Sequence, residues 1–290
     1  MAAGFDKLPE YGALSYLQRE DVVSVIEWLI ENKYILQTKG LYPVLHPTYE
    51  GLHYSETITV GKLKKLRDVL QKDTNDPEVL ENINSVNSEA LSMNSTLKYY
   101  NENASTFVSG TQAVDFHDAE DLFLSFLKPG SSILDFGCGS GRDTRYFLEK
   151  GYEVTATDGS ERLCALASDF CGIPVRKLLF QELEDRDTYD GIWACASILH
   201  AGRAEQPDIY RRMIRALKAG GILYTSYKYG RFEGARGERY FTDFDEESFM
   251  EFLRDFPELS IEKMWVSADV RPERSSEKWL NIILRKSIIG

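Results

Sequence analysis

The segment ILDFGCGSGRD, residues 133–143, constrains the fold of this chain more than any other feature. A short apolar run is followed by Gly137, Gly139 and Gly141, and then by a sequence typical of a helix. Glycines let a backbone approach a ligand closely, and the first turn of a helix offers free N–H groups. The segment therefore predicts a strand, a glycine loop and a helix that bind a ligand, rather than a tight turn without one.

The spacing of these glycines favours S-adenosylmethionine over NAD. Dinucleotide-binding loops have the form G-x-G-x-x-G and hold a pyrophosphate, whereas this loop reads G-x-G-x-G and follows Asp135. S-adenosylmethionine has no phosphate and carries an ammonium group, which an acidic residue such as Asp135 suits. We therefore expect the three glycines and Asp135 to bind this cofactor.

A second acidic residue, Asp158, ends the apolar run YEVTATD. An acid in this position can accept hydrogen bonds from both ribose hydroxyls. The alternative is that Asp158 caps the next helix, but Ser160 can supply that cap by itself. We therefore favour ribose binding.

The C-terminal two-thirds of the chain alternates between strand-like and helix-like segments. Strands are predicted at 131–137, 152–158, 174–180, 190–199, 222–230, 259–269 and 278–286, and helices at 141–151, 160–170, 207–221 and 245–256. This order indicates an α/β fold, a Rossmann-like mostly parallel sheet with helices on both faces. The last two strands have no helix between them, so we expect an antiparallel hairpin at one edge.

The N-terminal third has a different organisation. Two amphipathic segments flank the extended stretch LYPVLHPTYEG, residues 41–51, which is similar to the wing region of RecQ-type helicases. A segment rich in Asn, Ser and Asp follows at 75–97. We therefore expect a small winged-helix-like domain with a linker helix over 1–95 and a methyltransferase domain over 96–290.

The segment from Tyr99 to Lys286 resembles the class I S-adenosylmethionine-dependent methyltransferases, and within them the tellurite-resistance/thiopurine-like subgroup. The resemblance rests on ILDFGCGSGRD, GYEVTATDGS, YDGIWACASILH, LKAGGILYTSYKYG and WVSADVRPERSSEKWLN. It implies a seven-stranded sheet whose final strand is reversed. It also implies roles for further residues: Phe180 and Gln181 would bind adenine, Ala196 and Ser197 would lie beside the sulfonium, and Tyr99, Tyr100 and Asn103 would cover the cofactor.

The methyl acceptor is expected at the ends of the fourth and fifth strands. His200 follows the fourth strand and is our candidate for the general base, with Tyr227 as a second catalytic candidate. Lys228, Arg239 and Arg271 would form a pocket for an anionic or electron-rich small molecule, unless they are ordinary ion pairs of a solvated loop. The chain lacks the Pro-Pro-Tyr/Phe turn used in amino methylation of bases, and Cys195 has no preceding proline, so base C5 methylation is disfavoured.

The net charge of −12 argues against nucleic acid or anionic membranes as the main partner. Residues 1–96 hold nine Lys and Arg against fourteen Asp and Glu, although residues 62–72 are locally basic. The alternative is a nucleic-acid-binding or regulatory protein, in which residues 1–72 bind nucleic acid and the methyltransferase fold acts on nucleic acid or only senses the cofactor. A lid role of the N-terminal part and a homodimer also remain open. The chain has no run long enough for a membrane span, no signal sequence, no metal-ligand spacing and four unpaired cysteines, so we expect a cytoplasmic enzyme without a metal.

Overall fold

The computed structural model describes residues 35–37, 45–47, 95–271 and 274–288. The chain separates into two units, Met1–Leu91 and Ser92–Gly290. In the first unit, β1 (Ile35–Gln37) and β2 (Leu45–Pro47) form an antiparallel pair. The rest of the predicted winged helix, including the basic stretch at 62–72, lies outside the described residues.

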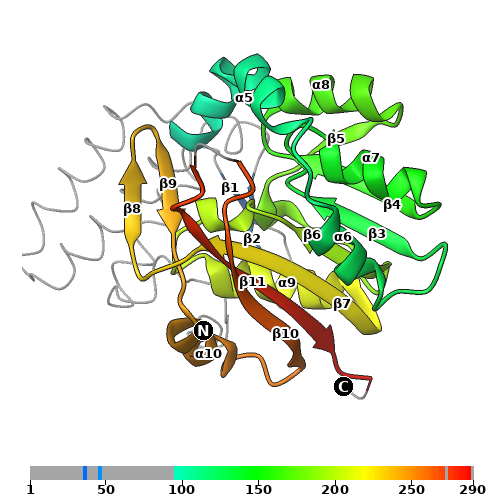
Figure 1. Ribbon diagram of the computed structural model, residues 1–290. Helices are drawn as coiled ribbons and strands as arrows, with labels where there is room; N and C mark the ends of the chain where they lie inside the picture. The colour runs from blue at the N-terminus through cyan, green and yellow to red at the C-terminus, as the bar shows by residue number, and fades with distance from the viewer. Residues whose placement is uncertain (1–34, 38–44, 48–94, 272–273, 289–290) are drawn as a thin grey trace, which may run out of the picture. The chain divides into compact units, whose positions relative to one another are not determined.

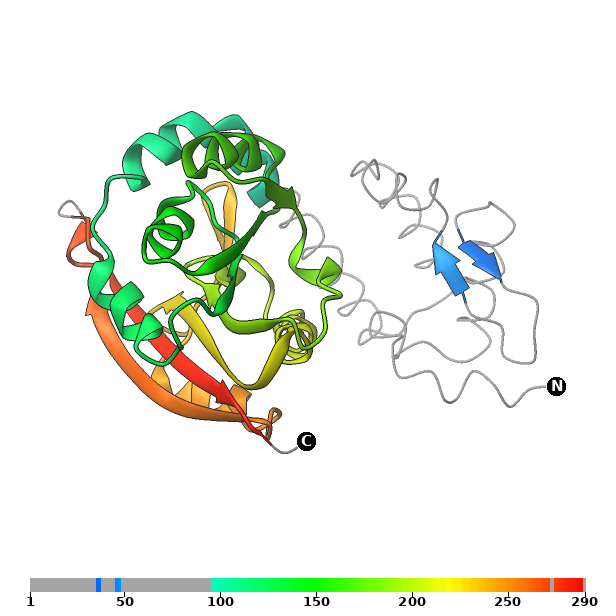
Figure 2. The ribbon, with the colours of Figure 1, turned by 90° about the vertical axis from the view of Figure 1, so that its right-hand side faces the viewer.

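The second unit is built on one seven-stranded mixed sheet (Figures 1 and 2). Its strands in chain order are β3 (Ser132–Phe136), β4 (Glu153–Asp158), β5 (Val175–Lys177), β6 (Tyr189–Ala194), β7 (Leu217–Lys228), β10 (Leu259–Ala268) and β11 (Lys278–Lys286). Their order across the sheet is β10-β11-β7-β6-β3-β4-β5. The strands from β7 to β5 are parallel, whereas β11 is antiparallel to both of its neighbours. The prediction of a seven-stranded sheet with a reversed final strand is therefore confirmed.

Helices cover both faces of this sheet, as expected when parallel strands are apolar throughout. On one face, α6 (His117–Leu124) and α7 (Arg142–Glu149) place Phe123 and Phe147 against Trp193 of β6. On the other, α9 (Gln206–Ala216) and α10 (Glu246–Leu253) contribute Tyr210 and Phe249 to a second apolar cluster. Helix α8 (Glu161–Cys171) contacts β4 and β5.

Local sequence signals set the helix boundaries near the site. Gly141 adopts a left-handed conformation (φ 77°) immediately before α7. At the start of α8, the Ser160 hydroxyl accepts a hydrogen bond from the Leu163 amide at 3.2 Å, which is the cap the sequence predicts. Asp158 is therefore not needed for capping.

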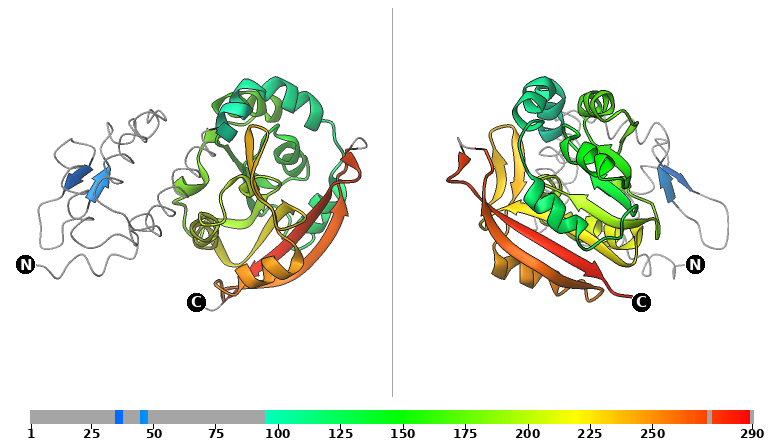
Figure 3. Two further views of the ribbon diagram at one scale, coloured as in Figure 1. Left: turned by 90° about the vertical axis from the view of Figure 1, so that its left-hand side faces the viewer. Right: turned by 45° about the vertical axis from the view of Figure 1, so that its right-hand side comes forward.

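Two elements were not predicted. Residues 95–102 are helical and continue, after a break at Asn103, into α5 (Ala104–Thr111). A two-stranded hairpin, β8 (Glu233–Arg236) and β9 (Arg239–Thr242), follows β7. Figures 1 and 3 show the tip of this hairpin beside the start of the helical segment, and the Tyr240 amide donates to the Thr96 hydroxyl at 2.9 Å. Together they cover the carboxyl ends of β4, β6 and β7. Among the described residues, no helix is both long and apolar enough to cross a membrane.

Candidate active site

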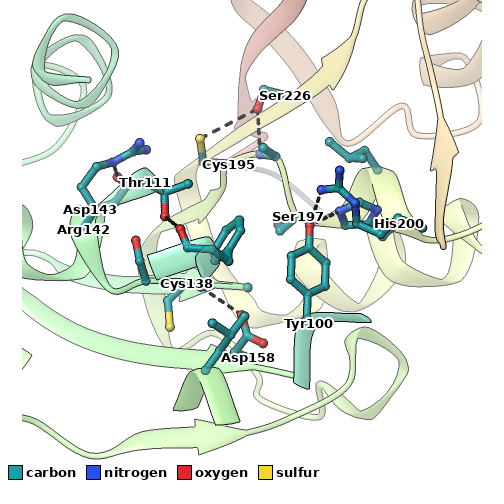
Figure 4. Close-up of a pocket in the computed structure, with 18 of the residues that line it drawn as sticks. Tyr100, Thr111, Cys138, Arg142, Asp143, Asp158, Cys195, Ser197, His200 and Ser226 are labelled. Carbon is teal, nitrogen blue, oxygen red and sulfur yellow. Dashed lines mark hydrogen bonds and ion pairs between the residues drawn. The ribbon is translucent and has the colours of Figure 1, made fainter. Parts of the chain in front are cut away.

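One cavity of about 230 Å³ lies at the carboxyl ends of the parallel strands (Figure 4). It runs from Asp158 and Phe180, past Gly137 and Gly139, to Ser197 and His200. Tyr100, from the helical segment at residues 95–102, also lines it, with its hydroxyl directed toward His200. Seven of the predicted site residues therefore share one cavity, which is where open α/β sheets bind their ligands.

The glycine loop packs closely against neighbouring residues, because its glycines carry no side chains. A Cβ atom on Gly137, whose φ is 88°, would lie 2.5 Å from the Ser197 Cβ, and one on Gly139 would lie 3.1 Å from the Phe107 ring. The Ser197 hydroxyl donates to the Phe136 carbonyl at 2.7 Å, which fixes the end of β6 against the loop. The two glycines therefore allow the loop to pack against Ser197 and Phe107 at the cavity wall, where side chains would overlap with them.

Asp158 faces the cavity with its carboxylate held by backbone amides. Its Oδ2 accepts from Gly139 N at 2.9 Å and its Oδ1 from Ser160 N at 2.8 Å. Each oxygen retains a lone pair for another donor. Burial raises the pKa of Asp158 to about 6, although both amide hydrogen bonds oppose the shift. The group is therefore largely ionised at neutral pH and suited to accept bonds from ribose hydroxyls.

Tyr100 and His200 form a hydrogen-bonded pair at the opposite end of the cavity. His200 Nδ1 lies 2.6 Å from the Tyr240 carbonyl, so this nitrogen carries the proton. Nε2 is then an acceptor, and the Tyr100 hydroxyl donates to it at 2.8 Å. Burial lowers the pKa of His200 to about 4, and Arg239 and Lys228 act in the same direction. The imidazole is therefore neutral at physiological pH, with its basic nitrogen directed at Tyr100.

Four predicted site residues do not line the cavity, and Tyr227 is the clearest correction. Its side chain is fully buried on the other face of the sheet, where its hydroxyl bonds to Tyr210 (3.1 Å) and Gln206 (3.0 Å). Neighbouring residues of a strand face opposite sides, so Ser226 and Lys228 line the cavity instead. The prediction of a catalytic role for Tyr227 is therefore wrong.

Asp135 is also placed differently from the prediction. Its side chain is 2% exposed and points to the α7 face of β3, where it accepts a 2.5 Å hydrogen bond from the Thr144 hydroxyl. Burial, with the nearby charge of Asp143, raises its pKa well above the usual range for aspartate. Asp135 therefore braces β3 against α7 and does not line the cavity.

The remaining two residues have packing or bracing positions. A Cβ on Gly141 would lie 2.6 Å from the Cys171 sulfur and 3.2 Å from the Ala167 Cβ, so this glycine allows α7 to approach α8. Gln181, in the 3-10 helix Phe180–Glu182, donates to Glu205 at 2.9 Å. Neither lines the cavity, so neither is a direct cofactor contact in this structure.

The predicted acceptor-side residues Lys228, Arg239 and Arg271 line the cavity, but the sequence did not indicate the residues around them. The Ser226 hydroxyl accepts from the Ala196 amide at 2.8 Å and holds Ala196 in a left-handed conformation (φ 48°). Such strain in a non-glycine residue is typical of functional sites. The wall continues through residues from α5, β9, β10 and β11, namely Phe107, Phe241, Ser267, Trp279 and Asn281. Only the register of β7, which places Ser226 on the cavity face, could have identified this residue.

A cluster of buried carboxyl groups lies behind the cavity wall at the start of α7. Burial, with the nearby charge of Asp143, raises the pKa of Glu120 to about 9. Asp143 accepts from Arg142 Nε at 2.5 Å and from Trp193 Nε1 at 2.7 Å. Arg142 itself lines the cavity.

The fold and the site together are typical of one class of protein domain. A Rossmann-like sheet with a reversed last strand, a G-x-G-x-G loop and an acid at the end of the next strand is the arrangement of an S-adenosylmethionine-dependent methyltransferase domain. Residues 133–221 match the methyltransferase domain family. The second unit therefore contains a segment that matches a methyltransferase domain, and the glycine loop and Asp158 lie within the matched residues.

Individual relatives agree with this assignment over part of their length. The chain is 31% identical over 97 residues to malonyl-[acyl-carrier protein] O-methyltransferase of Salmonella typhimurium, covering 32% of this chain and 37% of that protein. It is 33% identical over 110 residues to phosphoethanolamine N-methyltransferase 3 of Arabidopsis thaliana, covering 35% of this chain and 22% of that protein. The chain thus matches only about a third, or less, of the length of these curated relatives.

Solved structures support the fold. A 1,6-didemethyltoxoflavin-N1-methyltransferase of Burkholderia thailandensis, bound to 1,6-didemethyltoxoflavin and S-adenosylhomocysteine, has a TM-score of 0.54 at 22% identity, covering 66% of this chain and 85% of that one. A [4+2]-cyclase has a TM-score of 0.53 at 18% identity, covering 68% of this chain and 96% of that one. Because the same fold occurs in a cyclase, the activity of the whole protein must be argued from its site.

Proposed function

We propose that this protein transfers the methyl group of S-adenosylmethionine to a small anionic or electron-rich acceptor. The observation that carries the proposal is that one continuous cavity joins Asp158 and the glycine loop to the Tyr100–His200 pair. A cofactor site and a candidate base thus open into the same space.

The residues along the cavity fit the parts of the cofactor in order. Asp158 would accept hydrogen bonds from the ribose, and Phe180, packed edge-on to Phe136 at 5.0 Å between ring centroids, would contact the adenine. The glycine loop and Arg142 would hold the amino-acid end. When bound, S-adenosylmethionine supplies an electrophilic methyl group. Asp135 does not line the cavity, so Asp158, the glycine loop and the domain match support the cofactor assignment.

The Tyr100–His200 pair would remove a proton from an acceptor that carries one. The Tyr100 oxygen can take the acceptor's proton as its own proton passes to His200 Nε2. Arg239 Nη1 donates to the same oxygen at 3.3 Å and stabilises negative charge on it. Tyr100 would therefore touch the acceptor, and His200 would act through Tyr100.

The pKa of Asp158 provides a test of the ribose assignment. The ionised carboxylate accepts two hydroxyl hydrogen bonds, so binding of S-adenosylhomocysteine should weaken as the pH falls through about 6. The ionised fraction falls about tenfold between pH 7 and pH 5, and calorimetry should show about a tenfold rise in Kd. Asp158→Asn should bind more weakly at pH 7 and lose this pH dependence. A wild-type Kd that is constant from pH 5 to pH 7 would remove the ribose role.

A further inference from the structure

Five basic residues line the cavity, and their charges are not equivalent. The five are Arg142, Lys228, Arg239, Arg271 and Arg274. Three of these are paired: Arg142 with Asp143 (2.5 Å), Arg271 with buried Asp269 (2.6 Å) and Lys228 with Glu277. A paired cation contributes little net charge to a ligand site. The expectation that Lys228 and Arg271 bind an anion is therefore not supported.

Arg239 has a different environment. Within residues 95–271 and 274–288, no carboxylate forms an ion pair with it. Its guanidinium instead lies over the Tyr99 ring at 4.8 Å and near the Phe241 ring at 5.3 Å, and it uses one N–H to reach the Tyr100 hydroxyl. An arginine has five N–H donors, so most of them are available to a ligand. Arg274 also has no carboxylate partner among the described residues, so an experiment must separate the two.

The aromatic walls do not favour a cationic acceptor. Rings such as Trp279 and Phe241 can bind a cation over their faces. Here Lys228 already lies 5.0 Å from the Trp279 centroid, and Arg239 lies 5.3 Å from that of Phe241. At the Phe241 ring a cationic acceptor would therefore meet the charge of Arg239, whereas the Lys228 charge at Trp279 is already paired with Glu277.

Resting on the proposed function, we infer that the acceptor binds as an anion, and that Arg239 holds its negative group next to the Tyr100–His200 pair. The position follows from the contacts: Arg239 and His200 both bond to the Tyr100 hydroxyl, at 3.3 and 2.8 Å. An anionic group on Arg239 thus lies at the reacting end of the cavity. Arg239 is then the residue that selects the acceptor's charge.

The inference can be tested with three probes of one shape and different charge. The full chain is saturated with S-adenosylhomocysteine and titrated with benzoate, benzyl alcohol and benzylamine by calorimetry. We expect benzoate to bind at least about tenfold more tightly than the other two. Arg239→Gln should weaken benzoate binding about tenfold or more, and Arg239→Lys, which keeps the charge, should restore part of it.

Two further variants test whether the loss of benzoate binding is specific to Arg239. Arg231→Gln removes an exposed arginine outside the cavity, close in sequence to the β8–β9 hairpin, and should leave benzoate binding unchanged. Unchanged S-adenosylhomocysteine affinity shows that each variant is folded. The inference is overturned if benzoate does not bind, if the three probes bind equally, or if Arg274→Gln abolishes benzoate binding while Arg239→Gln does not. Failure of wild-type protein to bind S-adenosylhomocysteine would instead contradict the proposed function.

Discussion

Replacing His200 by alanine is expected to lower turnover about 100-fold or more, with little change in S-adenosylhomocysteine affinity. The variant removes the nitrogen that receives the Tyr100 proton, while Asp158 and the glycine loop remain in place. Initial rates of S-adenosylhomocysteine formation, with any acceptor that the unaltered protein methylates, provide the measurement. Because burial lowers the pKa of His200 to about 4, kcat/KM should show no titration of this group between pH 5 and pH 8.

Two tyrosine variants are the matched controls for this result. Tyr100→Phe breaks the same hydrogen bond and should lose a similar factor, since the pair acts as a unit. Tyr227→Phe removes a hydroxyl at the carboxyl end of β7 that faces the core, so turnover should be preserved at a stability cost of about 1 kcal/mol. Full turnover in His200→Ala would show that the imidazole only positions Tyr240 and its hairpin.

The second large effect is expected at Gly137. An alanine there would bring a Cβ to 2.5 Å from that of Ser197, on a backbone with φ of 88°. Relieving the overlap requires movement of the glycine loop or of the end of β6, both of which line the cofactor site. Strain of this kind costs about 1–3 kcal/mol, so S-adenosylhomocysteine affinity should fall by about 5- to 150-fold.

Gly172→Ala is the control for a loss of S-adenosylhomocysteine affinity that comes from backbone strain alone. Gly172 ends α8 with a φ of 73°, but a Cβ there would meet no atom within 4 Å. It should lower stability by about 1 kcal/mol and leave cofactor affinity unchanged. Equal cofactor affinity in Gly137→Ala and wild-type protein would show that the loop does not bind the cofactor closely.

The parts of the site that could be predicted are those encoded by local sequence. The glycine loop and Asp158 follow apolar strands directly, and the parallel order of those strands brings their ends together. The capping of α8 by Ser160 is equally local. For these features the residue type, the spacing and the adjacent element were sufficient.

The errors arise where the direction of a side chain matters. Tyr227 and Ser226 are adjacent on β7, and only the strand register determines which of them faces the cavity. Asp135 likewise faces α7 because of its position in β3. A shift of one residue exchanges the two faces of a strand, so sequence alone could not settle either case.

Ion pairs between distant segments could not be predicted from the sequence either. Lys228 and Glu277 are 49 residues apart and meet because β11 lies beside β7. Arg239 reaches Tyr100, 139 residues away, because the β8–β9 hairpin stands beside the N-terminal helical segment. The charge of the acceptor site therefore depends on tertiary contacts that no local pattern contains.

Calorimetric titration of the full chain with S-adenosylhomocysteine and, separately, with NAD tests the central claim most directly. The open G-x-G-x-G loop and Asp158 predict saturable binding of S-adenosylhomocysteine with one site per chain, weakened by Asp158→Ala by about 1–3 kcal/mol. No binding of NAD is expected. Binding of NAD without binding of S-adenosylhomocysteine would contradict the account.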